Sequence, residues 1–360
     1  MKKILLVSIA CSLLLAGCWD ERLYKDITIV PLMGYDGEPG KWTGYFTHAV
    51  VANPDSISFS TVEGSGVSIE EARLDANRKT SESLDPTQVL VVLLSTKAVK
   101  TDLLETFDIA YRMPRTRLSS RFVVVEGDLA PFMEKTEKMG KEVPDYYDET
   151  LNTAIFASII PDEDIQLAVR LLLDEGIDLQ LPYVKMSETT GTPEVAGVAL
   201  FSDKVFSGHT LDTKESTIIQ ILKKKPGDET MFTFEWEKEG KKYPVTVGLV
   251  KYNKKWNIKD SKINAAYKMK VQVNEFAYNH LDEEKKRKEL EGFLSKELTN
   301  DFNEVIKKLQ EAKSDPVGFG RTVRAFHPHL WKKGKWQDTF SELDINVKVD
   351  VEITRTGIIN

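Results

Sequence analysis

The first eighteen residues place the strongest constraint on this chain. Lys2 and Lys3 form a short basic segment, and an apolar run of about a dozen residues follows at 4–15. The run is too short for a permanent span across a hydrocarbon layer of about 30 Å, but its basic start and small-residue end are typical of a secretory signal peptide. The letters LAGC, which end at Cys18, match the bacterial lipobox. We therefore predict a cleaved signal peptide at 1–17 and lipid attachment at Cys18, as diacylglyceryl and N-acyl groups; the alternative is an ordinary signal peptide with a chance cysteine.

Two acyl chains would tie the rest of the chain to the outer face of a membrane. Each buried methylene contributes about 0.8 kcal/mol, so one chain binds reversibly and two anchor stably. No later stretch approaches eighteen consecutive apolar residues, so no other span is expected. Cys11 lies in the predicted signal peptide and Cys18 is used for lipid, which leaves the body with no disulfide and no cysteine-ligated metal.

The composition is that of a globular protein with an acidic balance. The chain is 41% hydrophobic and 29% charged, and its formal net charge is −7. An acidic body is a poor binder of nucleic acid and would be repelled by an anionic membrane surface, so we expect no nucleic-acid partner and an attachment that depends on lipid. The length exceeds what one core fills, which predicts two or three domains.

The order of apolar patterns predicts an α+β fold with three mixed α/β domains, in which helices pack on sheets. We place an N-terminal α/β domain at 18–188, a middle α+β domain at 189–262, and a C-terminal domain with a long amphipathic helix and a sheet at 263–360. The polar Thr/Gly/Pro stretch at 187–193 marks the first boundary.

In the first domain, helical patterns alternate with short apolar runs. Ser68 and Glu71 predict a capping box at the start of a helix over 69–84. Continuous apolar runs at 89–94 and 122–125 are typical of strands buried on both faces. Further helices of this domain are predicted over residues 102–110, 148–159 and 163–173.

In the second domain we predict a helix over 212–222 and a hairpin whose strands, 243–252 and 256–259, flank a turn at 253–255. The last domain combines elements with clear periodicity. They are a long strand, a charged helix with one apolar stripe and a final alternating strand, at residues 263–276, 282–313 and 345–353.

Few residues have the spacing of a metal or catalytic site. His327 and His329 offer two imidazoles, but a metal needs three or four converging ligands, so a turn rigidified by Pro328 is the simpler interpretation. The stretches 318–320 and 64–66 lack the lysine and spacing of a phosphate-binding loop, and we expect their glycines to permit positive φ in tight turns. There is no G-x-S-x-G elbow to supply a hydrolase nucleophile.

Charged clusters also favour structural interpretations. Neighbouring carboxylates fit helix starts, where negative charge is favourable, in the pairs Asp162 with Asp164 and Glu70 with Glu71. Three lysines between Trp331 and Trp336 could touch lipid headgroups, or could belong to a solvated loop with two core-facing tryptophans. They are Lys332, Lys333 and Lys335. We predict no catalytic residue, no cofactor and no metal.

Several stretches carry a family likeness through their order and spacing. They are C-W-D at 18–20, the helix start at 64–72, G-V-A-L-F at 197–201 with the segments 204–208 and 211–215, and D-P-V-G-F-G at 315–320 followed by Trp331, Trp336, Phe340 and a strand ending at Gly357. With these residues the chain resembles the Ger(x)C family, the lipoprotein C subunits of spore germinant receptors, over nearly its whole length. A longer Gly/Pro turn after Asp36, and Ser68 where the family often has threonine, are small departures.

The resemblance implies three α+β domains with no known enzymatic activity. It also implies a place on the outer face of the inner spore membrane, in a complex with an A subunit and a multi-span B subunit that responds to nutrients. Contact with the small-molecule germinant is left open. Two alternatives remain: a solute-binding lipoprotein of a transporter, which would show two similar lobes and a cleft, and a lipoprotein hydrolase, which an active-site probe would label.

Overall fold

The computed structural model describes residues 24–53, 56–112, 116–139, 143–238, 240–259, 262–278, 280–331, 334 and 336–356. The strands are β1 (Ile27–Ile29), β2 (Leu32–Glu38), β3 (Lys41–Asn53), β4 (Ser56–Gly66), β5 (Ser83–Asp85), β6 (Val91–Ser95), β7 (Arg121–Val125), β8 (Gln180–Met186), β9 (Pro193–Ser202), β10 (Val205–Leu211), β11 (Met231–Lys238), β12 (Lys241–Lys259), β13 (Lys262–Phe276) and β14 (Asp344–Arg355). The helices are α2 (Ile69–Asn77), α3 (Leu103–Thr106), α4 (Ile109–Arg112), α5 (Leu129–Glu137), α6 (Val143–Phe156), α7 (Ile165–Leu172), α8 (Thr213–Lys223), α9 (Glu284–Glu311), α10 (Phe319–Phe326) and α11 (Trp336–Glu342).

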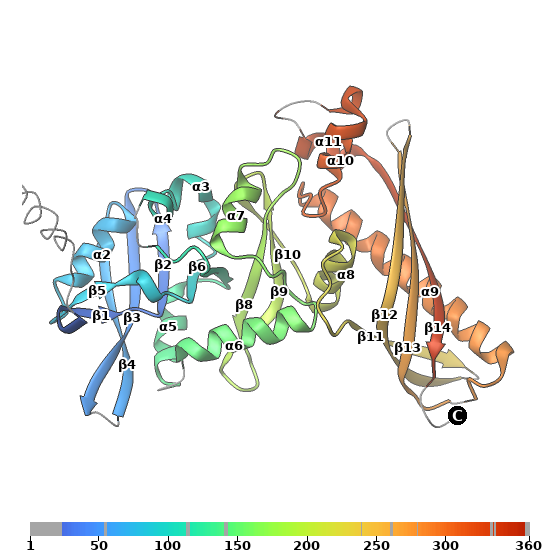
Figure 1. Cartoon of the computed structure of the whole chain (residues 1–360), viewed down its shortest axis with the longest axis horizontal. Coiled ribbons are helices and arrows are strands. Elements are labelled where there is room, and N and C mark those ends of the chain that lie inside the picture. Colours follow the sequence, from blue (N-terminus) through green and yellow to red (C-terminus); the bar gives the residue numbers. More distant parts are fainter. Residues whose placement is uncertain are drawn as a thin grey trace, which may run out of the picture.

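An eight-stranded sheet organises the N-terminal part, in the order β10-β9-β8-β7-β6-β2-β3-β4 (Figure 1). Its four central strands run parallel, and an antiparallel pair flanks them at each side. β6 and β7 are buried on both faces, which confirms their prediction from continuous apolar runs. Val91 and Leu93 of β6 face the core formed with α5 and α6, whereas Val92 and Leu94 face the core formed with α2 and α7.

A four-stranded sheet, β11-β12-β13-β14, organises the C-terminal part. β13 and β14 alternate buried and exposed residues, and β13 runs antiparallel to β12 and parallel to β14. The long helix α9 packs its apolar stripe on one face of this sheet, as the periodicity predicts. The stripe consists of Leu290, Leu294, Leu298, Phe302, Val305, Ile306 and Leu309. Of the helices in the described part of the chain, none is both long and apolar enough to cross a membrane.

The two large sheets, with a small parallel sheet of β1 and β5, make an α+β fold, in agreement with the predicted class. α8 lies between them, against β9 on one side and α9 on the other, so one apolar core runs across the junction (Figure 1). β8 pairs with β9 across the predicted boundary at 188, and β12 pairs with β13 across the one at 262. The division into three domains stays a prediction.

Some local expectations were wrong. Residues 253–255 do not form a turn, because they remain in β12 and pair with Lys268, Tyr267 and Ala266 of β13. The helix expected over 69–84 ends at Asn77, whose side-chain Oδ1 accepts the amide of Leu84 at 2.9 Å and so fixes the chain where β5 begins. The helix expected over 102–110 is two short ones, α3 and α4, and α5 was not expected.

The helix start at Ser68 follows the prediction in part. Ser68 Oγ accepts the amide of Glu71 at 3.1 Å, which confirms the cap. The Glu71 carboxylate reaches back to the amide of Val67, at 2.7 Å, one residue earlier than in a capping box.

Only one glycine of the two predicted stretches has a positive φ. Gly318 has φ +81°, but Gly64, Gly66 and Gly320 do not have positive values. A Cβ on Gly64 or Gly66 would collide with the backbone of α2, so these glycines allow the helix to approach β4 closely. Glycine is required at these two positions because a side chain would not fit there, and not because the backbone needs a positive φ.

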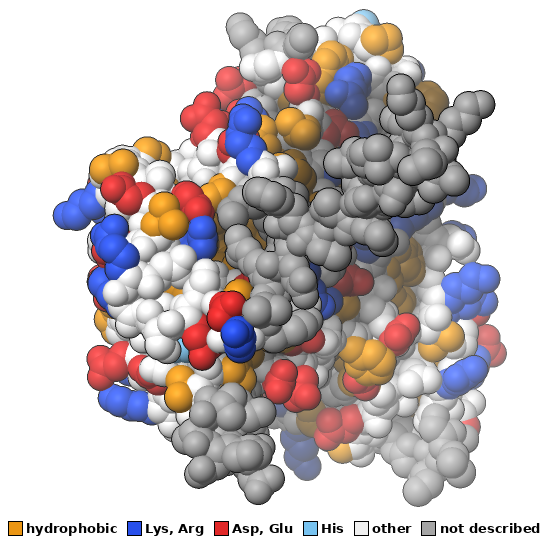
Figure 2. All heavy atoms as spheres, turned by 60° about the vertical axis from the view of Figure 1, so that its left-hand side comes forward, with side chains coloured by type: hydrophobic (Ala, Val, Ile, Leu, Met, Phe, Trp, Pro, Cys, Tyr) orange, Lys and Arg blue, Asp and Glu red, His pale blue; other side chains and the backbone are white. Residues whose placement is uncertain are grey.

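Figure 2 shows the surface on the N-terminal side of the molecule. Acidic and basic side chains are interspersed on the described part of this face, and apolar side chains form small groups. Scattered apolar residues are normal on a protein surface, so this view marks no docking face.

Candidate functional site

The residue predicted to carry lipid lies outside the described part of the chain. The described body begins at Tyr24, in the 3-10 turn Tyr24–Asp26, and β1 follows it directly. Five residues, 19–23, lie between Cys18 and the first described residue. If Cys18 carries lipid, the body is held close to the bilayer.

The other residues weighed for a site do not converge. His327 and His329 flank Pro328 after α10, and their ring centroids are 6.2 Å apart. Within the described residues, no group of three or more His, Cys, Asp and Glu side chains is placed to hold a metal ion. Trp336 is buried and stacks on Trp331 with a centroid distance of 5.5 Å. The three lysines between them, Lys332, Lys333 and Lys335, lie outside the described residues.

The weighed carboxylates have structural partners. Asp164 caps α7 by accepting the amide of Leu167 at 2.8 Å. Asp162 accepts from Arg121, at 3.3 Å, and Glu70 pairs with Arg73. These contacts agree with the interpretation as helix-start charges for Asp164 and Glu70, and place Asp162 in a surface ion pair.

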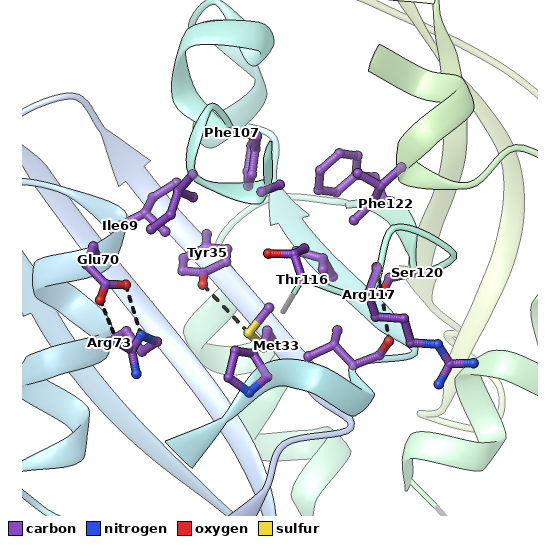
Figure 3. Close-up of a pocket in the computed structure, with 16 residues that line it drawn as sticks. Met33, Tyr35, Ile69, Glu70, Arg73, Phe107, Thr116, Arg117, Ser120 and Phe122 are labelled. Carbon is purple, nitrogen blue, oxygen red and sulfur yellow. Dashed lines mark hydrogen bonds and ion pairs between the residues drawn. The ribbon is translucent and has the colours of Figure 1, made fainter. Parts of the chain in front are cut away.

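A small cavity of about 60 Å³ lies under α2 in the N-terminal part (Figure 3). Its lining is mainly apolar, with Ile69 from α2, Tyr35 from β2, and Phe107 and Phe122. Two of the polar groups of its lining have partners: Arg73 donates to Glu70 at 2.9 Å through Nε, and Ser120 Oγ is 2.6 Å from the carbonyl of Val89. The described lining offers no activated nucleophile, and the volume suits a few waters rather than a metabolite.

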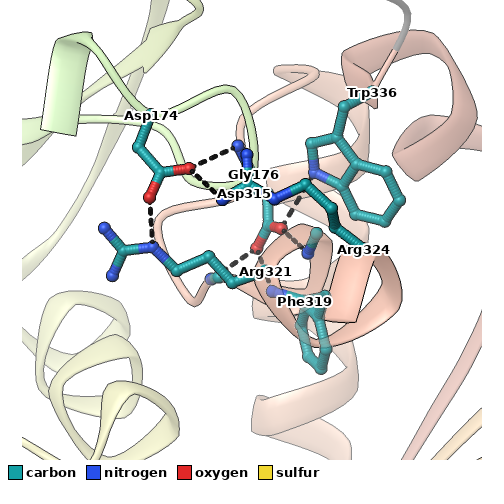
Figure 4. A network of polar contacts seen from close by, with 9 residues as sticks. Asp174, Gly176, Asp315, Phe319, Arg321, Arg324 and Trp336 are labelled. Carbon is teal, nitrogen blue, oxygen red and sulfur yellow. Dashed lines mark hydrogen bonds and ion pairs between the residues drawn. The ribbon is translucent and has the colours of Figure 1, made fainter. Parts of the chain in front are cut away.

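The strongest polar cluster lies at the junction of the two sheets, around Asp315 (Figure 4). This buried carboxylate caps α10: Oδ1 accepts the amides of Gly318 at 2.8 Å and Phe319 at 3.1 Å. Oδ2 accepts the amide of Gly320 at 2.8 Å and the indole Nε1 of Trp336 at 3.0 Å. One side chain thus fixes α10 and α11 relative to the end of α9.

Asp315 is joined to Asp178, which precedes β8 in the other sheet. Asp178 Oδ2 accepts the amide of Asp315 at 2.7 Å, and the carbonyl of Asp315 accepts the amide of Asp178 at 2.9 Å. Asp178 Oδ1 accepts the amide of Asp203 at 2.8 Å and the side-chain amide of Gln337 at 2.9 Å. Burial raises the pKa of Asp178 to about 6 and the pKa of Asp315 to about 7, against the lowering effect of these N–H donors.

A second carboxylate strengthens the same junction. Asp174 accepts Nε of Arg321 at 2.8 Å and Nη2 of Arg324 at 3.2 Å, both from α10 (Figure 4). The amide of Arg321 also donates to the carbonyl of Gly176 at 2.9 Å. A Cβ on Gly320 would lie 2.6 Å from the Trp336 ring and 2.8 Å from the Gly176 carbonyl. The loop after α7 and the start of α10 therefore meet backbone to backbone.

The sequence did not predict this cluster. The stretch 315–320 entered through the family likeness, and Asp178 and Asp174 were not singled out. One signal was present: Asp178 stands alone among Ile177, Leu179 and Leu181, and an aspartate inside an apolar run requires a buried partner. All the partners named here are N–H donors that the carboxylates hold in place, so the cluster fixes the junction rather than performing chemistry.

Comparison with known proteins identifies the family of this chain. A model described as "Spore germination protein N-terminal domain" matches residues 20–186, and one described as "Spore germination B3/ GerAC like, C-terminal" matches residues 196–357. The chain is 24% identical to the spore germination protein GerQC of Bacillus cereus over 357 residues, which cover 96% of this chain and 97% of the relative. It is 24% identical to the spore germination protein KC of Bacillus subtilis (strain 168), with 97% of this chain and 94% of the relative covered.

A solved structure supports the fold. The crystal structure of the GerBC protein superimposes with a TM-score of 0.56 and 19% sequence identity, covering 90% of this chain and 97% of that one. Both family models match in order, and the relatives align over nearly their whole length. The chain therefore belongs to the GerAC/GerKC-like family of spore germination C-subunit proteins.

Proposed function

We propose that this chain is the lipid-anchored, non-enzymatic C subunit of a spore nutrient germinant receptor, and that it acts in germination by assembling with the A and B subunits. The observation that carries the proposal is the ordered match of both germination family models, at 20–186 and 196–357. The protein would sit on the outer face of the inner spore membrane, tied through Cys18.

The structure is consistent with a role in docking. The cavity under α2 is small and mainly apolar, and the carboxylates at the junction hold N–H donors. A rigid body held close to the bilayer by a short tether can present a fixed surface to membrane subunits. This supports assembly rather than turnover of a substrate.

The anchor is tested by a Cys18→Ala variant expressed in the native host. We expect this variant to leave the membrane fraction, to lose incorporation of labelled palmitate, and to weaken germination through its receptor, because the thioether has nowhere to form. Cys11→Ala, a change of the same residue type inside the predicted signal peptide, is the matched control and should remain in the membrane. A Cys18→Ala protein that still requires detergent for extraction would contradict the lipid anchor.

Assembly is tested separately, by a crosslink map between this protein and the other receptor subunits in spores. Crosslinks to the A and B subunits are expected for the wild-type protein. Binding of an amino acid or sugar by the purified protein, without such crosslinks, would favour a solute-binding lipoprotein instead.

A further inference from the structure

The second half of β12 has a strand neighbour on one side only. β11 pairs with β12 from Lys241 to Gly248, whereas β13 continues alongside it to Lys259, and Figure 1 shows both long strands reaching well beyond β11. The amide of Leu249 still donates to the carbonyl of Thr230, at 2.8 Å. Beyond that point, the backbone of residues 251–259 has no hydrogen bond to any described element other than β13. An unpaired edge of this kind is a template for another strand.

The opposite edge of the same sheet is closed. Side chains spaced four residues apart on α9 accept alternate backbone amides of β14, at 2.9–3.0 Å. The pairs are Asn303 with Val347, Thr299 with Val349, Ser295 with Val351, and Glu291 with Ile353. The fold therefore covers one edge of this sheet and leaves part of the other open.

The open edge carries positive charge on its outer face. Lys251, Lys255 and Lys259 are exposed there and have no ion pair within the described residues. Lys251 stands opposite Lys270 of β13, and Lys259 stands opposite Lys262. Like charges across a strand pair are destabilising. Lys270 and Lys262 are paired with Glu352 and Asp344 of β14, whereas the three lysines of β12 have no compensating anion among the described residues of a chain whose net charge is −7.

The inner face of the same segment is apolar apart from Lys254, which is half-buried, lies over the Trp256 ring at 3.8 Å and donates to the carbonyl of Leu222 at 2.7 Å. Tyr252, Trp256 and Ile258 are half-buried and pack against the core, and Trp256 stacks on Phe319 with a centroid distance of 4.5 Å. A strand added at this edge would thus meet three exposed lysines on one face and mainly apolar side chains on the other, because successive side chains of a strand point to opposite faces. The single lysine of the inner face, Lys254, already donates to Leu222.

We propose that residues 251–259 of β12 are a docking edge for an extended segment of a partner protein that alternates acidic and apolar residues. The segment adds a strand to the sheet: its backbone pairs with the open edge, its carboxylates face the lysines, and its apolar side chains cover Trp256 and Ile258. A second copy of this edge is excluded as occupant, because pairing would bring the lysines of both copies together. This docking edge would be part of the proposed assembly role. It depends on that role only for which protein supplies the partner segment.

The test uses the full chain purified in detergent and a labelled ten-residue peptide that alternates glutamate and valine. Fluorescence anisotropy measures its affinity for the wild-type protein, for the triple variant K251E/K255E/K259E, and for K135E/K285E/K296E, which has the same charge change at exposed helical lysines. We expect the edge variant to bind about tenfold or more weakly than wild type, and the control to remain within about threefold. A peptide N-methylated at alternate residues keeps its charge but cannot pair as a strand, and we expect it not to bind.

Three results would overturn the proposal: no binding to the wild-type protein, equal losses in both triple variants, or equal binding of the N-methylated peptide. Retention of the protein on vesicles of anionic phospholipid through the same three lysines, without peptide binding, would assign the edge to the membrane instead. None of these results bears on the Cys18→Ala experiment, so a failed docking edge remains distinguishable from a failed anchor.

Discussion

The side chain of Asn303 on α9 replaces a missing strand neighbour for Val347 on β14. Its Nδ2 donates to the carbonyl of Val347 at 2.8 Å, and its Oδ1 accepts the amide of the same residue at 2.9 Å. This is the pattern by which one strand residue satisfies another, here supplied by a helix. It explains why a helix with one apolar stripe also carries a row of polar residues beside that stripe.

Removing this amide should destabilise the C-terminal sheet. We expect Asn303→Ala to lower the free energy of unfolding by about 1–3 kcal/mol, because two backbone groups of a part-buried edge lose their partner. Urea denaturation measures the change, which is valid when the unfolding free energy depends on urea concentration with the same slope in both proteins. Asn300→Ala on the exposed face of the same helix should alter stability by about 0.5 kcal/mol or less. Equal effects from both variants would show that the edge is not held by Asn303.

Two helical glycines should respond oppositely to the same substitution. Gly320→Ala places a methyl group against the Trp336 ring and the Gly176 carbonyl, so we expect a loss of about 1–3 kcal/mol in unfolding free energy. Gly292→Ala in α9 places its methyl group in open space and should gain about 0.5–1 kcal/mol from helix propensity. Thermal unfolding of both variants checks the pair, and a stable Gly320→Ala protein would contradict the close contact at the junction.

The sequence predicts an element well where the pattern of that element is local and extends over many residues. α9, β13 and β14 were predicted because their periodicity is local and long, and no tertiary contact reverses it. The turn expected at 253–255 was wrong because polar residues there resemble a loop, whereas Asn253 and Lys255 lie on the exposed face of a strand and Lys254, on the other face, donates to the carbonyl of Leu222. Which side chains of a strand are exposed depends on which other elements pack beside the strand. The sequence of the strand alone does not show this.

The junction cluster could not be predicted from local sequence patterns. Asp178 and Asp315 are separated by most of the middle of the chain, and neither residue has a motif that names the other. The family likeness included 315–320 without giving a physical reason for these residues. The structure supplies one, since Asp315, Gly318 and Gly320 are the groups that seat α10 against the N-terminal sheet.

The cap at Asp315 should not tolerate an amide in place of the carboxyl group. Asp315→Asn keeps the size of the side chain but turns an NH₂ group toward backbone or indole N–H donors. We expect a loss of about 2–4 kcal/mol in unfolding free energy, together with greater solvent exposure of Trp336 in its fluorescence. Asp350→Asn, on the exposed face of β14, is the matched control and should change neither quantity. Unchanged stability in Asp315→Asn would mean that the carboxylate is not the element that fixes α10.

The pair Asp178 and Asp315 should also make the junction sensitive to pH. Burial raises their pKa values to about 6 and about 7, above the ordinary value of 3.8, so between about pH 4 and pH 7 the folded protein retains protons that the unfolded chain releases. Their contribution to stability is therefore most favourable near pH 4 and declines as the pH rises to 7. Urea denaturation from pH 4 to pH 8 should show that wild-type stability, measured relative to Asp178→Asn, falls across this range.

The comparison with the variant cancels the titration of groups that do not interact with Asp178, and Asp350→Asn should leave the wild-type profile unchanged. The sign of the slope decides between two physical effects on the same carboxylates. A falling difference means that the cost of burying charge is larger than the gain from the N–H donors that surround Asp178 and Asp315. A rising difference would mean that the donors prevail, that the carboxylates stay ionised in the folded protein, and that the junction tightens with increasing pH.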